Sequence, residues 1–174
     1  YDLAGNPLGN DFRVDQAPGT THIFDPAVAA GPGGNFTVTW ADRRPGVDDI
    51  YARAFDSAGN PAGNDFRVDQ DPGLHHAYTP EIAADSAGNV IILWEDIRAG
   101  SSQIYARRLD SAGAPLDNEF RYDQGTAPNK LPHVAVNGDD LVAGVWVSYT
   151  LGTSVYASLW GDDADSDGIV DAAD

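Results

Sequence analysis

The last twelve residues carry the clearest chemical pattern in the sequence, a run of acidic side chains with the spacing of calcium ligands. Carboxylates occupy positions 1, 3, 5, 9 and 12, a glycine at position 6 permits a sharp turn, and position 7 offers its carbonyl. The candidate ligands are Asp163, Asp165, Asp167, Ile169, Asp171 and Asp174. Carboxylates this close repel one another unless a cation joins them. The spacing predicts a calcium-binding loop, with an unstructured acidic tail as the alternative.

A second pattern is an aspartate and an arginine that follow a tryptophan at fixed spacing. The pairs are Asp42 with Arg44 and Asp96 with Arg98. Loops of this kind are candidates for binding a glycan or a carboxylate, and an ion pair that pins a tight loop is the simpler interpretation. The third copy of the pattern has Ser148 and Thr150 instead, so a symmetric ring of ligand loops is already broken.

No set of residues indicates a catalytic site. The sequence has no cysteine, its serines have no paired base, and a nucleophile-elbow motif is absent. His22 and His76 occupy the same place in different repeats, so we do not expect them to share a zinc ion. A carboxylate pair for glycoside hydrolysis stays open because acids are plentiful, but nothing in the pattern favours one. We therefore predict that the chain is not an enzyme.

The elements that must position these residues form a repeat. Gly9 to Gln16 returns unchanged as Gly63 to Gln70 and altered as Asp117 to Gln124, with Phe12, Phe66 and Phe120 spaced by 54 residues. In the second copy, the runs 79–84, 90–94, 103–109 and 119–123 read as four short strands separated by Gly-rich and Pro-rich turns. Pro26, Pro80 and Pro132 each precede a tryptophan by 14 residues, so the frame holds in all three copies.

Four-stranded units that repeat in sequence predict an all-β fold of β-propeller type, with three blades in residues 1–160. A β-sandwich is the main competitor, but it does not predict near-identical sequence at a fixed period. The tryptophans Trp40, Trp94 and Trp146 end apolar strands, which favours packing between blades over sugar stacking. Residues 161–174 form a second segment, the start of the calcium-binding loop.

The repeat resembles those of bacterial secreted proteins related to sialidase-type propellers. The resemblance rests on Trp94 to Arg98, Ile104 to Arg107 and Asp110 to Gly113, and on the matching stretches after Trp40. The turn departs from the sialidase Asp box by one extra residue before the glycine, so the resemblance implies the propeller and not the hydrolase. The acidic C-terminal run resembles a thrombospondin type 3 repeat or half of a dockerin loop, which implies calcium as a ligand.

The phase of the repeat predicts assembly. The strand expected at Asp11–Val14 has no blade of its own, and the third repeat lacks a fourth strand after Trp160. We expect the first strand to complete a last blade, either in a six-bladed homodimer or in a filament of donated strands; a fragment of a longer array is the alternative. With no methionine, Tyr1 is not a translation start, which indicates a processed or excised chain.

Composition narrows the partners. The formal net charge of -17 repels phosphate backbones, so we do not expect nucleic acid as a ligand. No apolar run is long enough for a membrane span. We predict a secreted or cell-surface bacterial module with a structural or adhesive role that self-assembles and binds calcium. The alternatives are a carbohydrate-binding, lectin-like propeller and the remnant of a sialidase-like glycoside hydrolase.

Overall fold

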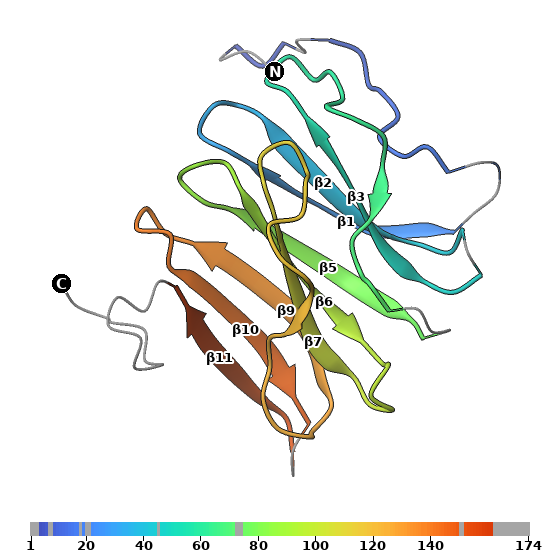
Figure 1. Cartoon of the computed structure of the whole chain (residues 1–174), viewed down its shortest axis with the longest axis vertical. Helices are drawn as coiled ribbons and strands as arrows, with labels where there is room; N and C mark the ends of the chain where they lie inside the picture. Colours follow the sequence, from blue (N-terminus) through green and yellow to red (C-terminus); the bar gives the residue numbers. More distant parts are fainter. Residues whose placement is uncertain are drawn as a thin grey trace.

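The computed structural model describes residues 4–6, 9–17, 19, 22–44, 46–71, 75–149 and 152–161, and these residues form three antiparallel sheets (Figure 1). Blade 1 contains β1 (Ile23–Ala30), β2 (Phe36–Asp42), β3 (Asp49–Phe55) and β4 (Phe66–Arg67). Blade 2 contains β5 (Ala77–Ala84), β6 (Val90–Asp96), β7 (Gln103–Leu109) and β8 (Phe120–Arg121). Blade 3 contains β9 (Asn129–Val136), β10 (Val142–Ser148) and β11 (Ser154–Trp160). The described part of the chain contains no helix that is long and apolar enough to cross a membrane.

The three sheets stand side by side, with β1, β5 and β9 as neighbours along one side of the arrangement (Figure 1). Strand order follows chain order in every blade, so each strand pairs with the one before it through a tight turn. The predicted all-β fold with propeller-type blades is therefore confirmed, including a third sheet of three strands among the described residues.

Three turns in the described part of the chain close in the same way because an aspartate opens each of them. Asp85 Oδ1 accepts hydrogen bonds from the backbone of Ala87 and Asn89, and Gly88 adopts φ +83°. Asp56 and Asp110 accept equivalent bonds at the next turns. A short carboxylate that caps its own turn, together with a glycine in the left-handed region, fixes where each strand ends.

Each junction between blades encloses its own hydrophobic core. Between blades 1 and 2, Ile50 and Ala52 pack against Ile92 and Trp94. Between blades 2 and 3, Leu93 and Ile104 belong to a second cluster with Trp146 and Val142. Strand β6, which is apolar from Val90 to Trp94 and ends in Glu95 and Asp96, is buried along its whole length because blade 2 has a neighbour on both sides.

The blades are also joined by paired hydrogen bonds between the end of one repeat and the residue just before the fourth strand of the next. Gln70 N donates to Glu119 Oε2 at 2.7 Å, and Glu119 N donates to Gln70 Oε1 at 2.8 Å. Arg107 Nη1 donates to the carbonyl of Val68 at 2.7 Å across the same junction. A residue at the end of a repeat thus binds a residue 49 positions later.

The segment 9–17 forms no strand, in contrast to the expected strand at Asp11–Val14, but it lies against blade 1 as a fourth strand lies against the next blade. Gln16 exchanges the same two hydrogen bonds with Asp65, both at 2.8 Å. Arg53 Nη1 donates to the carbonyl of Val14, and the ring of Phe12 lies 5.5 Å from that of Phe55. The segment therefore occupies the position of the fourth strand of a preceding blade.

Candidate functional site

The inner strands of the three blades share an irregularity at the same position. In each of them two residues lie opposite a single tryptophan of the neighbouring strand, which is a β-bulge. The bulged pairs of residues are Asp25–Pro26 opposite Trp40, Thr79–Pro80 opposite Trp94 and Leu131–Pro132 opposite Trp146. The recurrent spacing from proline to tryptophan in the sequence is thus the signature of these bulges, where a residue without an N–H costs no ladder bond.

The residue before each proline has an unusual backbone conformation. Asp25, Thr79 and Leu131 adopt φ +50°, +46° and +53°, in the left-handed region. For residues with a Cβ this conformation costs about 1 kcal/mol or more, and a following proline disfavours helical conformations further. Strain of this kind persists only where the surrounding structure imposes it, and it gathers at functional sites. Its repetition in three neighbouring strands marks this end of the inner strands as a candidate site.

These bulges border a hollow of about 220 Å³, which we call the axial hollow. Its lining residues are Asp25, Pro26, Thr79, Pro80, Glu81, Leu131, Pro132 and His133. His133 Nδ1 lies 3.5 Å from Glu81 Oε1, and the two side chains come from adjacent blades. The Thr79 hydroxyl is buried and has no hydrogen-bond partner in the protein. The hollow therefore combines two carboxylates, an imidazole and an unpaired hydroxyl, a set that suits a ligand rich in hydroxyl groups.

The predicted ligand loops lie elsewhere, and their charges pair within their own blades. Arg44 Nη2 lies 2.6 Å from Asp42 Oδ2 and 2.9 Å from Asp65 Oδ2. Its guanidinium group also covers the ring of Tyr51, with Cζ 4.0 Å from the ring centroid. Burial of Asp65 alone would raise the pKa of its carboxyl group, but the hydrogen bonds from Arg44 lower that pKa overall.

The same arrangement holds in blade 2, where Arg98 bridges Asp96 and Glu119 and lies over Tyr105. Because both arginines bind the segment before the fourth strand, the observed geometry has a mechanical role: it fastens that strand to its blade. Binding of an added ligand by these loops stays a prediction.

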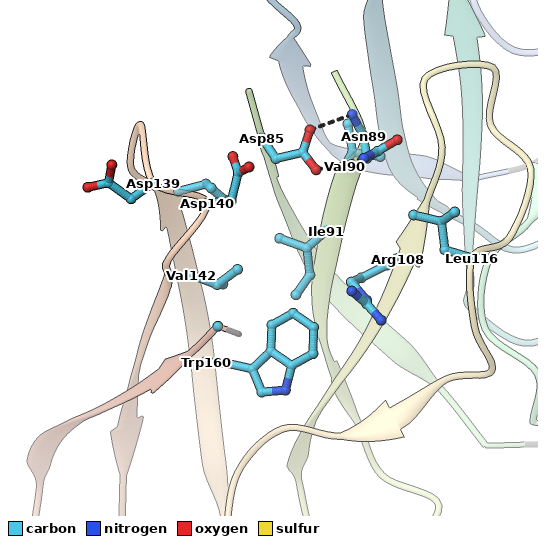
Figure 2. Close-up of a pocket in the computed structure, with 12 residues that line it drawn as sticks. Asp85, Asn89, Val90, Ile91, Arg108, Leu116, Asp139, Asp140, Val142 and Trp160 are labelled. Atoms are coloured by element: carbon cyan, nitrogen blue, oxygen red, sulfur yellow. Dashed lines mark hydrogen bonds between the residues drawn. The ribbon is translucent and has the colours of Figure 1, made fainter. Parts of the chain in front are cut away.

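A second hollow, of about 200 Å³, lies between blades 2 and 3 (Figure 2). Asp85 and Asp140 lie on adjoining turns at one end, and Arg108 and Trp160 lie at the other (Figure 2). Two of its charged groups already have partners: Asp140 accepts two hydrogen bonds from Ser86, and Arg108 binds Asp117 while it stacks 4.5 Å above the Trp160 ring. This hollow therefore serves the junction between the blades.

The predicted calcium ligands Asp163 to Asp174 lie outside the described residues, so their geometry is not part of the observed site. Within the ranges that the structure describes, no group of three or more histidine or acidic side chains has the arrangement of a metal site. His76 Nδ1 instead lies 2.6 Å from Asp48 Oδ2, and its ring stacks on Tyr78. Calcium binding remains a sequence-based prediction.

Sequence reasoning missed the residues of the axial hollow. Asp25, Glu81 and His133 share no motif, although Glu81 and His133 both directly follow the proline of their repeat. The signal that was available is the proline that follows Asp25, Thr79 and Leu131 in every copy. It marks the bulge, but the left-handed backbone and the convergence of the inner strands appear only in three dimensions.

Comparison with known proteins places the fold. No family model matches the chain, and no curated protein matches it. Among solved structures, endo-arabinase from Bacteroides thetaiotaomicron superposes with a TM-score of 0.57 at 12% identity, over 91% of this chain and 62% of that one. The sialidase Hz136 from a Hadza microbial source gives 0.59 at 11% identity, over 79% and 34%. Penicillium chrysogenum α-L-arabinanase, solved with arabinobiose, gives 0.52 at 16% identity, over 75% and 43%.

The chain thus spans less than two thirds of the length of these structures, and at such identity the likeness concerns the fold. The comparison supports the sialidase-like propeller that the repeats resemble. It contradicts the prediction that the chain is not an enzyme, because the solved structures that share its fold include an endo-arabinase, an arabinanase and a sialidase. The prediction rested on the absence of a catalytic motif and on the altered Asp-box turn, and neither bears on side chains that come together only where the inner strands converge.

Proposed function

We propose that these blades bind carbohydrate in the axial hollow. The observation that carries the proposal is the convergence of Asp25, Glu81 and His133 from three successive inner strands at strained bulges. Carboxylates accept hydrogen bonds from sugar hydroxyls, and the unpaired hydroxyl of Thr79 both donates and accepts. The carbohydrate-active names of the structural neighbours, one of them an arabinanase solved with arabinobiose, agree with this ligand class.

Glycoside hydrolysis is a second candidate function, and it is favoured by two carboxylates in one hollow. Most glycoside hydrolases use a pair of carboxyl groups, one as the general acid that protonates the leaving oxygen and the other as base or nucleophile. Glu81 has an imidazole beside it, which can assist proton transfer, whereas Asp25 faces the hollow from the neighbouring blade. We assign Glu81 as the candidate acid and Asp25 as the candidate base or nucleophile.

Binding is tested by calorimetric titration of the chain with arabinobiose and, separately, with sialyllactose. We expect one of them to bind, and Asp25→Asn or Glu81→Gln to weaken that binding about tenfold or more, since each change removes a charged hydrogen-bond acceptor. Asp139→Asn is the matched control because this exposed acid lies at the other hollow. Equal binding by all four proteins would place the ligand elsewhere.

Hydrolysis is tested by the release of reducing ends from arabinan and of free sialic acid from sialyllactose. If the carboxylates act as a catalytic pair, both single variants lose activity by a factor of about 100 or more while the control keeps it. Activity that survives in Asp25→Asn and in Glu81→Gln would contradict the assignment and leave binding as the function.

Self-assembly, calcium binding and a secreted or surface location remain proposals from the sequence. Strand exchange draws support from β11, where Val155 is 75% exposed although its counterparts Ile50 and Ile104 are buried. A donated strand would lack the arginine clamp, because no described residue of blade 3 replaces Arg44 or Arg98. We therefore propose that any strand exchange is held mainly by backbone hydrogen bonds. Light scattering that gives the mass of a single chain at millimolar concentration would contradict self-assembly.

A further inference from the structure

Among its described residues, blade 3 borders a surface hollow, which we call the slot, beside the tyrosine that corresponds to the arginine-covered tyrosines of blades 1 and 2. Tyr156 occupies the place of Tyr51 and Tyr105, whose rings lie about 4 Å beneath the guanidinium groups of Arg44 and Arg98. In the sequence, the position that corresponds to these arginines is threonine 150. Tyr156 is 49% exposed, and Tyr149 beside it is 46% exposed.

The slot is a hollow in the protein surface with a volume of about 430 Å³. One side is formed by aromatic rings and the other by the loop that joins blades 2 and 3. The residues that line it are Gln124, Gly125, Thr126, Ala127, Pro128, Asn129, Trp146, Ser148, Tyr149 and Tyr156. It shares no lining residue with the axial hollow.

A buried polar group provides an independent sign of a ligand. Asn129 is 2% exposed, it lines the slot, and its Oδ1 has no hydrogen-bond partner in the protein. Its Nδ2 donates to the buried carboxylate of Asp123, and because a carboxylate only accepts, this bond fixes which end of the amide faces away. Asn129 stands where blade 2 has Ala77, so the polar group belongs to blade 3 alone.

The charges of the slot decide which ligand fits. In blades 1 and 2 the arginine is balanced by a buried aspartate at the end of the tryptophan strand, Asp42 or Asp96, and by an acid before the fourth strand. In blade 3 the buried aspartate is replaced by Ser148, and no described residue supplies the second acid. A cation placed there would lose water without gaining a counter-charge, which is costly. The slot is therefore neutral, aromatic and supplied with an unpaired acceptor.

From these observations we infer that blade 3 carries a second carbohydrate-binding site, in which a neutral sugar ring stacks on Tyr156 and donates a hydroxyl hydrogen bond to Asn129 Oδ1. A sugar offers an apolar C–H face to an aromatic ring and hydroxyl donors at its edge, which matches both halves of the slot. The site is separate from the axial hollow and does not depend on the roles of Asp25 and Glu81.

The test is a titration of the 174-residue chain with three neutral disaccharides, arabinobiose, mannobiose and cellobiose, followed by tyrosine and tryptophan fluorescence and by calorimetry. We expect at least one to bind, and Tyr156→Ala to weaken this binding about tenfold. The pair Ser148→Asp with Thr150→Arg, which restores the residue types of blades 1 and 2, should also abolish it. Val155→Ala, on the other face of the same strand, and Asp139→Asn, at the hollow between blades 2 and 3, should leave it unchanged.

Three results would overturn the inference. The first is that none of the three disaccharides binds at concentrations on the order of 10 mM. The second is that binding persists in Tyr156→Ala. The third is preferential binding of arginine amide, which would mark the slot as a cation site. Titration of the separate variant Glu81→Gln distinguishes the two sites. If it removes all sugar binding, only the axial hollow binds carbohydrate, and if Tyr156→Ala does so, only the slot does.

Discussion

Gly144 and Tyr122 fit together only as a pair. A Cβ added to Gly144 would lie 2.4 Å from Cε1 of Tyr122, which is too close for any real contact. At the junction between blades 1 and 2 the equivalent positions hold Ile92 and Val68, which belong to one buried cluster. The same space is therefore filled mainly by Ile92, on the second strand of blade 2, at one junction. At the other junction it is filled by Tyr122, on the segment after β8.

The first prediction follows from this exchange of volume. Gly144→Ala should lower the free energy of unfolding by about 1–3 kcal/mol, because Tyr122 is buried and must move. The double variant Gly144→Ile with Tyr122→Val copies the other junction and should recover part of that loss, as measured by urea unfolding. Losses that simply add in the double variant would show that the two residues are not coupled.

Asp49 provides the second prediction. Burial, followed by the nearby charge of Asp69, raises the pKa of its carboxyl group to about 7, and Arg67 Nη2 at 2.9 Å only partly offsets this. The folded chain thus keeps a proton that the unfolded chain releases near pH 4, so this group lowers stability as pH rises from about 4 to 7. Asp49→Asn should raise the free energy of unfolding by about 1–3 kcal/mol at pH 8 and hardly at all at pH 4.

The control for that series is Asp56, whose carboxyl group has the opposite shift. Hydrogen bonds from the side chain and backbone of Asn60 lower the pKa of Asp56. Its stabilising effect is present at neutral pH and disappears as pH falls through the lowered pKa. Asp56→Asn should therefore destabilise the chain at neutral pH. Urea unfolding of both variants at several pH values distinguishes the raised pKa of Asp49 from the lowered pKa of Asp56. A higher free energy of unfolding at pH 8 for both variants would contradict these opposite shifts.

The third prediction concerns the strained bulges. Leu131 is 51% exposed at φ +53°, so Leu131→Gly relieves backbone strain and gives up little burial. We expect the melting temperature to stay level or to rise, by an equivalent of about 0.5–1 kcal/mol. Leu116→Gly is the matched control, since Leu116 is 50% exposed with no such strain, and it should destabilise. Equal destabilisation by the two changes would show that the bulge stores no strain.

How far the sequence predicts this molecule depends on the kind of information. The blades were predictable because Phe12, Phe66 and Phe120 repeat at a fixed period and because Asp and Gly residues mark the turns between strands. The axial hollow was not, because Asp25, Glu81 and His133 lie in separate blades and meet only when the inner strands converge. The slot at Tyr156 lay between these extremes: the missing arginine and the recurrent tyrosine were both visible in the sequence, but the stacking of the arginine on the tyrosine in blades 1 and 2 was not.

The fourth prediction addresses the acidic C-terminal run, which lies outside the described residues. Calorimetric titration of the chain with calcium chloride should give a heat of binding for one site, because six oxygen donors recur at ligand spacing. Asp167→Ala, at the fifth position of the run, should abolish that heat. Asp139→Ala, a distant exposed acid, should retain it. A flat titration of the unaltered chain would favour an unstructured acidic tail.

The paired hydrogen bonds between repeats have a consequence for how such a chain can lengthen. Because Gln70 binds an acid 49 residues later, within the next 54-residue unit, duplication of one whole unit in the gene creates a new junction together with the new blade. No second mutation is needed to make the added unit adhere. The position of one glutamine therefore allows the array to lengthen by duplication of whole repeats. Residues such as Gly144, which fits only beside Tyr122, show where one repeat differs from the others at its junction.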